Sequence, residues 1–262
     1  MHQEATLQQI VAALADMPGV DAIALGGSTA AGLADVSSDL DVYVYYHQPL
    51  AAAAVRAARL SRLADEATLE VDLTAFGLED HLHVQHMLIE LIYLDLDRMS
   101  EEVHRSYGSG LSSEGYTTAL LYILFRSQIF HDPTGEVTAL RARLRAGFPE
   151  PTRARLLREH PELLRYYLEL LRVSQGRADL LYVQQMRYSI QMVYFNLLYA
   201  LNRRYHPGGK RLLSHAQRCA IQPAKLAERW NAISRLSPDD SALADRFEGL
   251  IDELLWLLEA DT

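Results

Sequence analysis

The segment spanning residues 22–46 constrains the fold more than any other part of the chain. It reads AIALGGSTAAGLADVSSDLDVYVYY. This pattern predicts an apolar strand, a tight turn at Gly26–Ser28, the start of a helix, and a second apolar strand that opens at Asp39 and Asp41. Two short apolar strands joined through a small-residue segment favour an α/β arrangement in this part of the chain.

Asp39 and Asp41 are candidate metal ligands. Residues two apart on a strand point to the same face, so the two carboxylates are expected side by side, about 6–7 Å apart along the strand. Like charges at that distance repel unless a cation lies between them, and Mg²⁺ prefers carboxylate oxygens together with substrate phosphates. The plain alternative is a polar strand start after a turn. The apolar run Val42–Tyr45 that follows indicates a half-buried strand and favours the metal interpretation.

The turn at Gly26, Gly27 and Ser28 is a candidate phosphate site. Glycines let backbone N–H groups approach a phosphate closely, and a helix N-terminus adds partial positive charge. A Gly-Gly pair by itself is a simple tight turn. Here the pair lies twelve residues before two acids. A phosphate-binding turn together with a metal-binding acidic pair would suit transfer of a group from a nucleoside triphosphate.

A family resemblance appears at these residues. The pattern G-[GS]-S, a spacer of about ten residues, and then S-D-x-D before an apolar strand resembles the nucleotidyltransferase superfamily that includes DNA polymerase beta. Within it, the chain is most similar to bacterial antibiotic nucleotidyltransferases such as the aminoglycoside and lincosamide adenylyltransferases. Many relatives carry Arg-Gly after the serine, where this chain has Ala31-Gly32.

The resemblance implies ATP as co-substrate, two Mg²⁺ ions, and nucleotide contacts from the turn and from Ser38. It also implies a third carboxylate on an apolar strand. Glu90 is the candidate, because a single acid within Leu88–Leu94 needs a partner if it is buried. Asp72 is the competing candidate. The basic turn that contains Lys210 resembles one in the helical domain of related uncharacterised nucleotidyltransferases, and Lys210 is a candidate contact to the triphosphate or to pyrophosphate. The alternative is a helix end with favourable cations.

Composition limits the partners. The formal net charge is −9, and residues 1–100 hold four Arg, no Lys and fifteen acids, hence 4 − 15 = −11. An acidic N-terminal half disfavours a nucleic acid substrate and favours a cationic acceptor. The single cysteine, Cys219, excludes an internal disulfide framework. Without an apolar run of about 20 residues or a signal peptide, we expect no membrane span and a cytoplasmic location.

The apolar periodicity predicts two domains. A small mixed-sheet nucleotidyltransferase domain is expected over residues 1–134, and an all-α helical bundle that binds the acceptor over residues 135–262. Strands are expected over 21–25, 41–45, 69–73, 88–94 and 127–130. Residues 76–80 are expected to form a turn, and His81, His83 and His86 are interpreted as loop and surface histidines.

The expected activity is Mg²⁺-dependent transfer of AMP from ATP to a hydroxyl of a small, antibiotic-like molecule, with release of pyrophosphate. The alternatives are an AMP-transferase or antitoxin-like enzyme acting on a protein, and a catalytically silent nucleotide-binding protein. The oligomeric state is not predicted. For the acceptor pocket, the candidates are tyrosines and acids of the second domain: Tyr166, Tyr167, Tyr182, Tyr188, Tyr194, Tyr199, Glu162, Glu169 and Asp179.

Overall fold

The computed structural model of the chain describes residues 2–27, 39–47, 49–73, 78–84, 87–111 and 115–261. It divides into two compact units. The sheet unit comprises residues 1–104 and 123–147, and the helical unit comprises residues 105–122 and 148–262. A mixed sheet with helices, followed by a helical region, is the fold class expected from the sequence, and that expectation is confirmed.

The division between the units differs from a single boundary at residue 134. Residues 105–122 belong to the helical unit, and residues 135–147 belong to the sheet unit. The division falls within two helices, α4 (Leu96–Tyr107) and α5 (Ala119–Arg126). Each unit is made of two segments that are separate in the sequence, so a single boundary cannot divide the chain into these two units.

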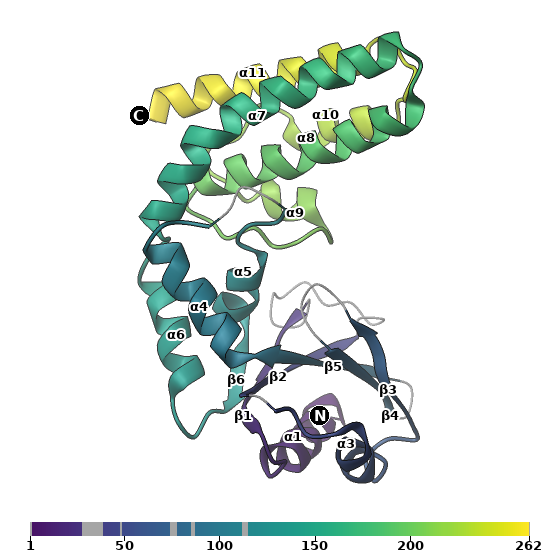
Figure 1. Cartoon of the computed structure of the whole chain (residues 1–262), viewed down its shortest axis with the longest axis vertical. Helices are drawn as coiled ribbons and strands as arrows, with labels where there is room; N and C mark the ends of the chain where they lie inside the picture. Colours follow the sequence, from purple (N-terminus) through teal and green to yellow (C-terminus); the bar gives the residue numbers. More distant parts are fainter. Residues whose placement is uncertain are drawn as a thin grey trace. The chain divides into compact units, whose positions relative to one another are not determined.

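The sheet unit contains a six-stranded sheet in the order β3-β4-β5-β2-β1-β6 (Figure 1). The central pair, β2 and β5, is parallel, and the other neighbouring strands pair antiparallel. The strands are β1 (Val20–Leu25), β2 (Leu40–Tyr46), β3 (Glu66–Leu73), β4 (Leu78–Val84), β5 (Met87–Asp95) and β6 (Gln128–His131).

One face of the sheet is covered by α1 (His2–Ala15) and α3 (Ala53–Leu60) (Figure 1). The apolar residues of α1 recur at helical spacing and are buried: Leu7, Ile10, Val11 and Leu14. They share a core with alternate residues of the strands, among them Val42 and Val44 of β2. Because side chains alternate along a strand, the odd-numbered residues of β2 lie on the opposite face.

A buried ion pair joins α3 to the sheet. The Arg56 Nε atom donates to Asp80 Oδ2 at 2.8 Å, and Nη2 donates to Oδ1 at 3.2 Å. The Tyr93 hydroxyl also donates to Asp80 Oδ2, at 2.8 Å, and Arg56 Nη1 donates to the Ala51 carbonyl at 2.7 Å. A bidentate geometry with additional donors offsets the cost of burying both charges.

Strand β4 was not predicted from the sequence. The expected turn at residues 76–80 was wrong for residues 78–80, because these described residues begin β4. Its sequence, LEDHLHV, contains two acids and two histidines. This polar composition resembles that of a loop. Asp80 is 0% exposed because Arg56 neutralises it from α3. A contact between distant segments therefore allows an acid to occupy a core position.

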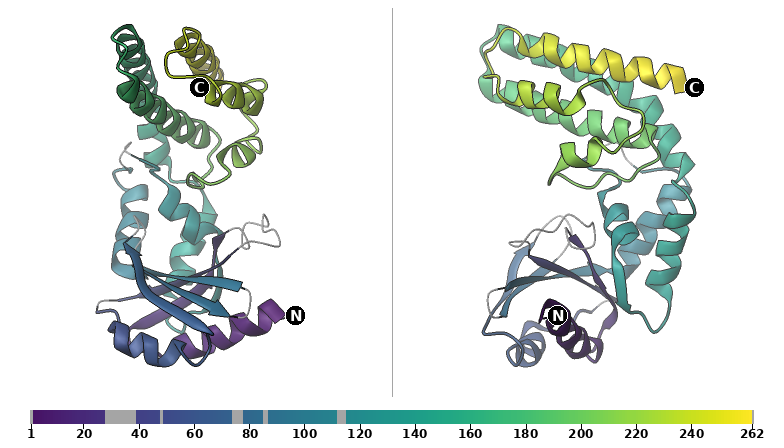
Figure 2. Two further views of the ribbon diagram at one scale, coloured as in Figure 1. Left: turned by 90° about the vertical axis from the view of Figure 1, so that its right-hand side faces the viewer. Right: turned by 180° about the vertical axis from the view of Figure 1, so that it is seen from behind.

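The helical unit is built around two long antiparallel helices, α7 (Glu150–Gly176) and α8 (Leu180–Leu201) (Figure 2). Asp179 caps α8 by accepting a hydrogen bond from the Tyr182 amide at 3.2 Å. The core of this unit is aliphatic and aromatic, with Phe195, Trp230 and Phe247 buried together. Three further helices complete it: α9 (Leu212–Ala216), α10 (Leu226–Ser234) and α11 (Leu243–Asp261). Among the described residues, the sheet unit also contains the helix α6 (Glu136–Ala146).

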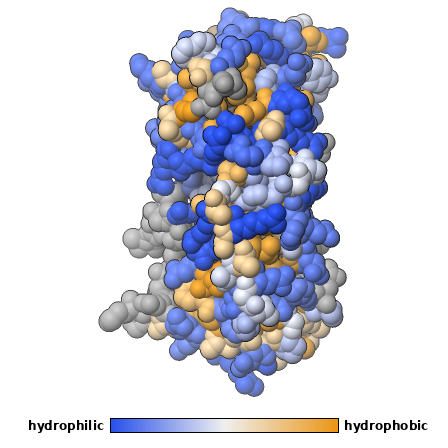
Figure 3. Space-filling model, turned by 90° about the vertical axis from the view of Figure 1, so that its left-hand side faces the viewer, coloured by the Kyte–Doolittle hydropathy of each residue, from blue (hydrophilic) through white to orange (hydrophobic). Residues whose placement is uncertain are grey.

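The surface drawn in Figure 3 carries hydrophobic side chains in small groups among hydrophilic ones. Throughout the described residues, each helix is either too short or too polar to cross a lipid bilayer.

Candidate nucleotide site

The strand register brings three candidate residues and one histidine into one row across the sheet. Asp41 of β2 lies opposite Glu90 of the parallel strand β5, and Glu90 lies opposite His81 of β4. On the other side, the Gly26 amide, at the end of β1, donates to the Asp41 carbonyl oxygen at 2.9 Å. Residues opposite each other in a ladder share a face, so this row lies on the face that α1 and α3 do not cover.

Both glycines of the turn are required by close contacts. A Cβ atom on Gly26 would lie 1.8 Å from Cε2 of Tyr43, and one on Gly27 would lie 1.5 Å from Oδ2 of Asp41. Gly27 also has a φ of +58°, in the left-handed region. A side chain at either position would displace Tyr43 or the Asp41 carboxylate. The two glycines therefore pack directly against Tyr43 and Asp41 of β2.

The acidic pair begins β2. Asp39 is exposed and precedes the first strand residue, the buried Leu40, and Asp41 is half-buried at the second strand position. The predicted contacts from Ser28 and Ser38 lie outside the described residues. What can be placed is the end of β1, the glycine pair and both aspartates.

The strand order favours Glu90 over Asp72 as the neighbour of Asp41. Glu90 is half-buried on β5, directly beside β2. Asp72 belongs to β3, opposite Glu79 of β4, so β4 and β5 lie between Asp72 and Asp41.

His81 is a site neighbour that was missed from the sequence. Its Nε2 atom lies 3.5 Å from Glu79 Oε2 and 3.9 Å from Glu90 Oε1. The alternation Glu79, His81, His83 was the available signal, because it places three polar residues on one face of a strand. The interpretation as a loop and surface histidine was wrong for His81, which is partly buried within β4.

The residue types of the row fit a hard divalent cation, since Asp39, Asp41 and Glu90 supply carboxylate oxygens. Within the described ranges, no three His, Cys, Asp or Glu side chains are grouped so that they could hold an ion. Convergence of the three carboxylates on one metal therefore stays a prediction.

Tyr43 is a buried aromatic residue of this face. Burial raises its pKa far above the usual range, and the charges of Asp41, Tyr45 and Glu90 act in the same direction. The tyrosine therefore remains a neutral phenol beneath the turn.

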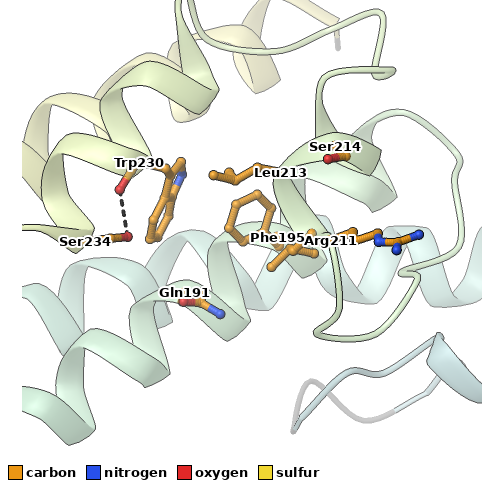
Figure 4. Close-up of a pocket in the computed structure, with 8 residues that line it drawn as sticks. Gln191, Phe195, Arg211, Leu213, Ser214, Trp230 and Ser234 are labelled. Atoms are coloured by element: carbon orange, nitrogen blue, oxygen red, sulfur yellow. Dashed lines mark hydrogen bonds between the residues drawn. The ribbon is translucent and has the colours of Figure 1, made fainter. Parts of the chain in front are cut away.

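The helical unit holds a separate pocket of about 230 Å³, lined by Gln191, Phe195, Arg211, Leu212, Leu213, Ser214, Trp230 and Ser234 (Figure 4). The rings of Phe195 and Trp230 form its inner wall, with centroids 5.0 Å apart. The Ser234 hydroxyl donates to the Trp230 carbonyl at 2.9 Å. The pocket thus combines aromatic walls with amide, hydroxyl and guanidinium groups.

The acceptor residues predicted from sequence do not line this pocket. Tyr194 and Tyr199 are core residues, and Tyr166 and Tyr188 are exposed. Tyr167 and Tyr182 pack against the core of the helical unit. Among the acids, Asp179 caps α8, Glu169 accepts a hydrogen bond from Arg172 at 2.7 Å, and Glu162 is exposed. Aromatic residues at helical spacing were the signal for Phe195 and Trp230, but this pattern is also typical of a core.

Lys210 is exposed and lies in the turn before α9, next to Arg211, whose backbone has a φ of +53°. The cationic turn is therefore part of the helical unit and borders the aromatic pocket. Contact of Lys210 with the triphosphate stays a prediction.

Comparison with known proteins finds a family model that matches within the sheet unit. Residues 7–102 match the family model described as a nucleotidyltransferase domain, and residues 115–212 match a domain of unknown function (DUF4037). A crystal structure of a nucleotidyltransferase-like protein from Exiguobacterium sibiricum 255-15 is similar at 14% identity and a TM-score of 0.49. The similarity covers 98% of this chain and 75% of that one. No curated protein matches. The matched range contains Gly26, Gly27, Asp39, Asp41 and Glu90, so the resemblance to the nucleotidyltransferase superfamily seen in the sequence is confirmed over residues 7–102.

Proposed function

We propose that the chain transfers AMP from ATP to a hydroxyl of a small molecule and releases pyrophosphate. The observation that carries the proposal is the row Gly26–Gly27, Asp41 and Glu90, in which the glycine turn contacts one acid and the next strand supplies the second. A phosphate-binding turn beside paired carboxylates suits a triphosphate with divalent cations.

Each residue of the row has a proposed role. Gly27 and Ser28 bind the β- and γ-phosphates through the turn, and Asp39, Asp41 and Glu90 are the residues that would hold Mg²⁺. When bound, the ions would neutralise charge on the triphosphate and orient it. The acceptor oxygen forms the new bond to the α-phosphorus, the bond to the bridging oxygen breaks, and the hydroxyl proton is released. The protein contributes mainly by positioning these groups.

We further propose that the helical unit binds the acceptor through the pocket at Phe195 and Trp230. A ring-containing polyol or amino sugar has apolar faces for the aromatic walls and hydroxyls for Gln191 and Ser214. The chain has two tryptophans, of which Trp230 is buried in this pocket and Trp256 is exposed. In a Trp256→Phe variant, a change of Trp230 emission on titration with candidate acceptors is the expected result.

The experiment is a screen of small-molecule hydroxyl acceptors with [α-³²P]ATP and Mg²⁺. Transfer of label to an acceptor is expected, together with its loss in Asp41→Asn and on removal of Mg²⁺ by EDTA. Asp95→Asn is the matched control, because Asp95 ends the same strand as Glu90 and accepts a hydrogen bond from the Arg98 amide. Label on a protein would favour the protein-modifying alternative. ATP binding without transfer would favour a silent binding protein, and the absence of ATP binding would overturn the proposal.

A further inference from the structure

The chain around the pocket of the helical unit is strongly basic. Residues 180–235, which include α8, α9 and α10, contain nine Arg or Lys residues and one acid, Glu228, hence 9 − 1 = +8. The formal net charge of the whole chain is −9, so this basic segment has the opposite sign. All eight residues that line the pocket belong to the basic segment. The pocket is therefore built from the part of the chain that attracts anions.

Part of this positive charge is paired with acids away from the pocket. Arg203 Nε lies 2.9 Å from Glu150 Oε1, and Arg229 forms an ion pair with Glu253. Neither arginine lines the pocket. The charge that a ligand would meet in the pocket must therefore come from other residues of the basic segment.

Arg211 supplies charge in the pocket itself. Among the described residues that line the pocket, Arg211 is a cation and none is an acid. Its side chain extends past the Phe195 ring, so its guanidinium lies at the rim of the pocket (Figure 4). A guanidinium presents its N–H donors in a planar fork that matches a phosphate or a carboxylate. A ring held at Phe195 and Trp230 would thus place an anionic substituent against Arg211.

A second arginine, Arg187, adjoins the pocket at the end of α10. Its Nη1 atom donates to the Leu236 carbonyl at 2.9 Å, and Nη2 donates to the Ile233 carbonyl at 3.0 Å. Ile233 precedes Ser234, which ends α10 and lines the pocket. A helix C-terminus carries partial negative charge, and Arg187 offsets it there. The α10 side of the pocket is therefore no site for a cation either.

We propose that the compound bound at Phe195 and Trp230 carries an anionic group, a phosphate or a carboxylate, that binds Arg211. That this compound is the acceptor rests on the function proposed above. Of the ring compounds named there, a polyol with an anionic group fits the charge of the pocket. The ammonium group of an amino sugar would meet Arg211 without a compensating acid. The acids that favour a cationic acceptor lie within residues 1–100, whereas the lining residues belong to the helical unit.

The test titrates four hexoses of the same ring size and different charge into the Trp256→Phe variant without ATP, and follows the emission of Trp230. The probes are glucose 6-phosphate, glucuronate, glucose and glucosamine. At least one of the two anions should bind about tenfold more tightly than glucose, and glucosamine should bind more weakly than glucose. Glucuronate and glucose 6-phosphate together distinguish a carboxylate from a phosphate. The preference for the anion should diminish at high salt.

Two matched arginine variants in the Trp256→Phe background test the assignment to Arg211. Arg211 and Arg203 both have a positive φ, +53° and +49°, which Asn tolerates. Arg211→Asn should raise the Kd for the preferred anion about tenfold and change the Kd for glucose by less than about twofold. Arg203→Asn should bind all four hexoses as its parent does, because Arg203 pairs with Glu150 outside the pocket.

Four results would overturn the inference and leave the proposed function in place. They are equal affinities for all four hexoses, tighter binding of glucosamine than of either anion, an anion preference that survives in Arg211→Asn, and no response of Trp230 to any hexose. If Arg211→Asn fails to fold, the hexose series on the Trp256→Phe variant decides. A clear anion preference without AMP transfer to any acceptor would overturn the proposed function, while the specificity of the pocket would stand.

Discussion

The two faces of the sheet handle negative charge in opposite ways. On the face covered by α1 and α3, Asp80 is fully buried and accepts hydrogen bonds from Arg56 and Tyr93. On the other face, Asp41 and Glu90 are half-buried, lie opposite each other on neighbouring strands, and adjoin a glycine turn. An acid that stabilises the fold receives its countercharge from the chain. Two acids held side by side suit a countercharge that arrives with the substrate.

The largest effect is expected on the covered face. Arg56→Met should lower the free energy of unfolding by roughly 3–5 kcal/mol, because it leaves the Asp80 carboxylate buried without its main partner. Urea denaturation measures this. The double variant Arg56→Met/Asp80→Leu should recover most of the loss, since it removes both charges. If the single variant is as stable as the wild type, the contrast between the faces does not hold.

The opposite result is expected at the turn. Asp41→Asn should lower AMP transfer roughly 100- to 1,000-fold, because it removes charge from the site that positions the triphosphate. Its free energy of unfolding should stay equal to that of the wild type or rise, since a repulsion with Glu90 is relieved. Transfer assays and urea denaturation on the same preparation measure both quantities. A large loss of stability would make Asp41 a structural acid like Asp80.

Two buried histidines of the helical unit, His160 and His206, extend the comparison to acid pH. His160 on α7 is 0% exposed, and burial lowers its pKa from 6.5 to about 4, against the weaker opposing effect of Glu159. Below pH 6.5 the unfolded chain takes up this proton and the folded protein does not. The contribution of His160 to stability should therefore fall by about 3 kcal/mol between pH 6.5 and pH 4 and then level off. His160→Gln should flatten this part of the profile in thermal unfolding across pH. His206, whose pKa burial lowers to about 3, adds a decline of its own from pH 6.5 to about pH 3 in both proteins.

The smallest effect tests the choice of the third acid. Glu90→Gln should lower AMP transfer roughly 10- to 100-fold. Asp72→Asn should change it by less than about threefold, because a residue outside the site contributes little to positioning the triphosphate. Initial rates at saturating ATP measure both variants. The reverse order would identify Asp72 as the functional acid and would contradict the inference drawn from the strand order.

Local spacing accounts for most of what could be predicted in the sheet unit. The strands β1, β2 and β5 and the two faces of β2 follow from the alternation of apolar and polar residues, which depends only on nearby residues. The same is true of the long helices α7, α8 and α11, whose apolar residues recur every three to four positions.

Strand partners and burial depended on the tertiary structure. That Glu90, and not Asp72, lies next to Asp41 follows from the order β3-β4-β5-β2, which joins segments far apart in the sequence. Asp80 and Arg56 are core residues only because they meet each other, and His81 is a site neighbour only because β4 pairs with β5. The position of a residue in the repeat of its helix or strand determines which face of that element it lies on. Which side chains it meets depends on the free energy of packing whole elements together, and no local pattern contains that information.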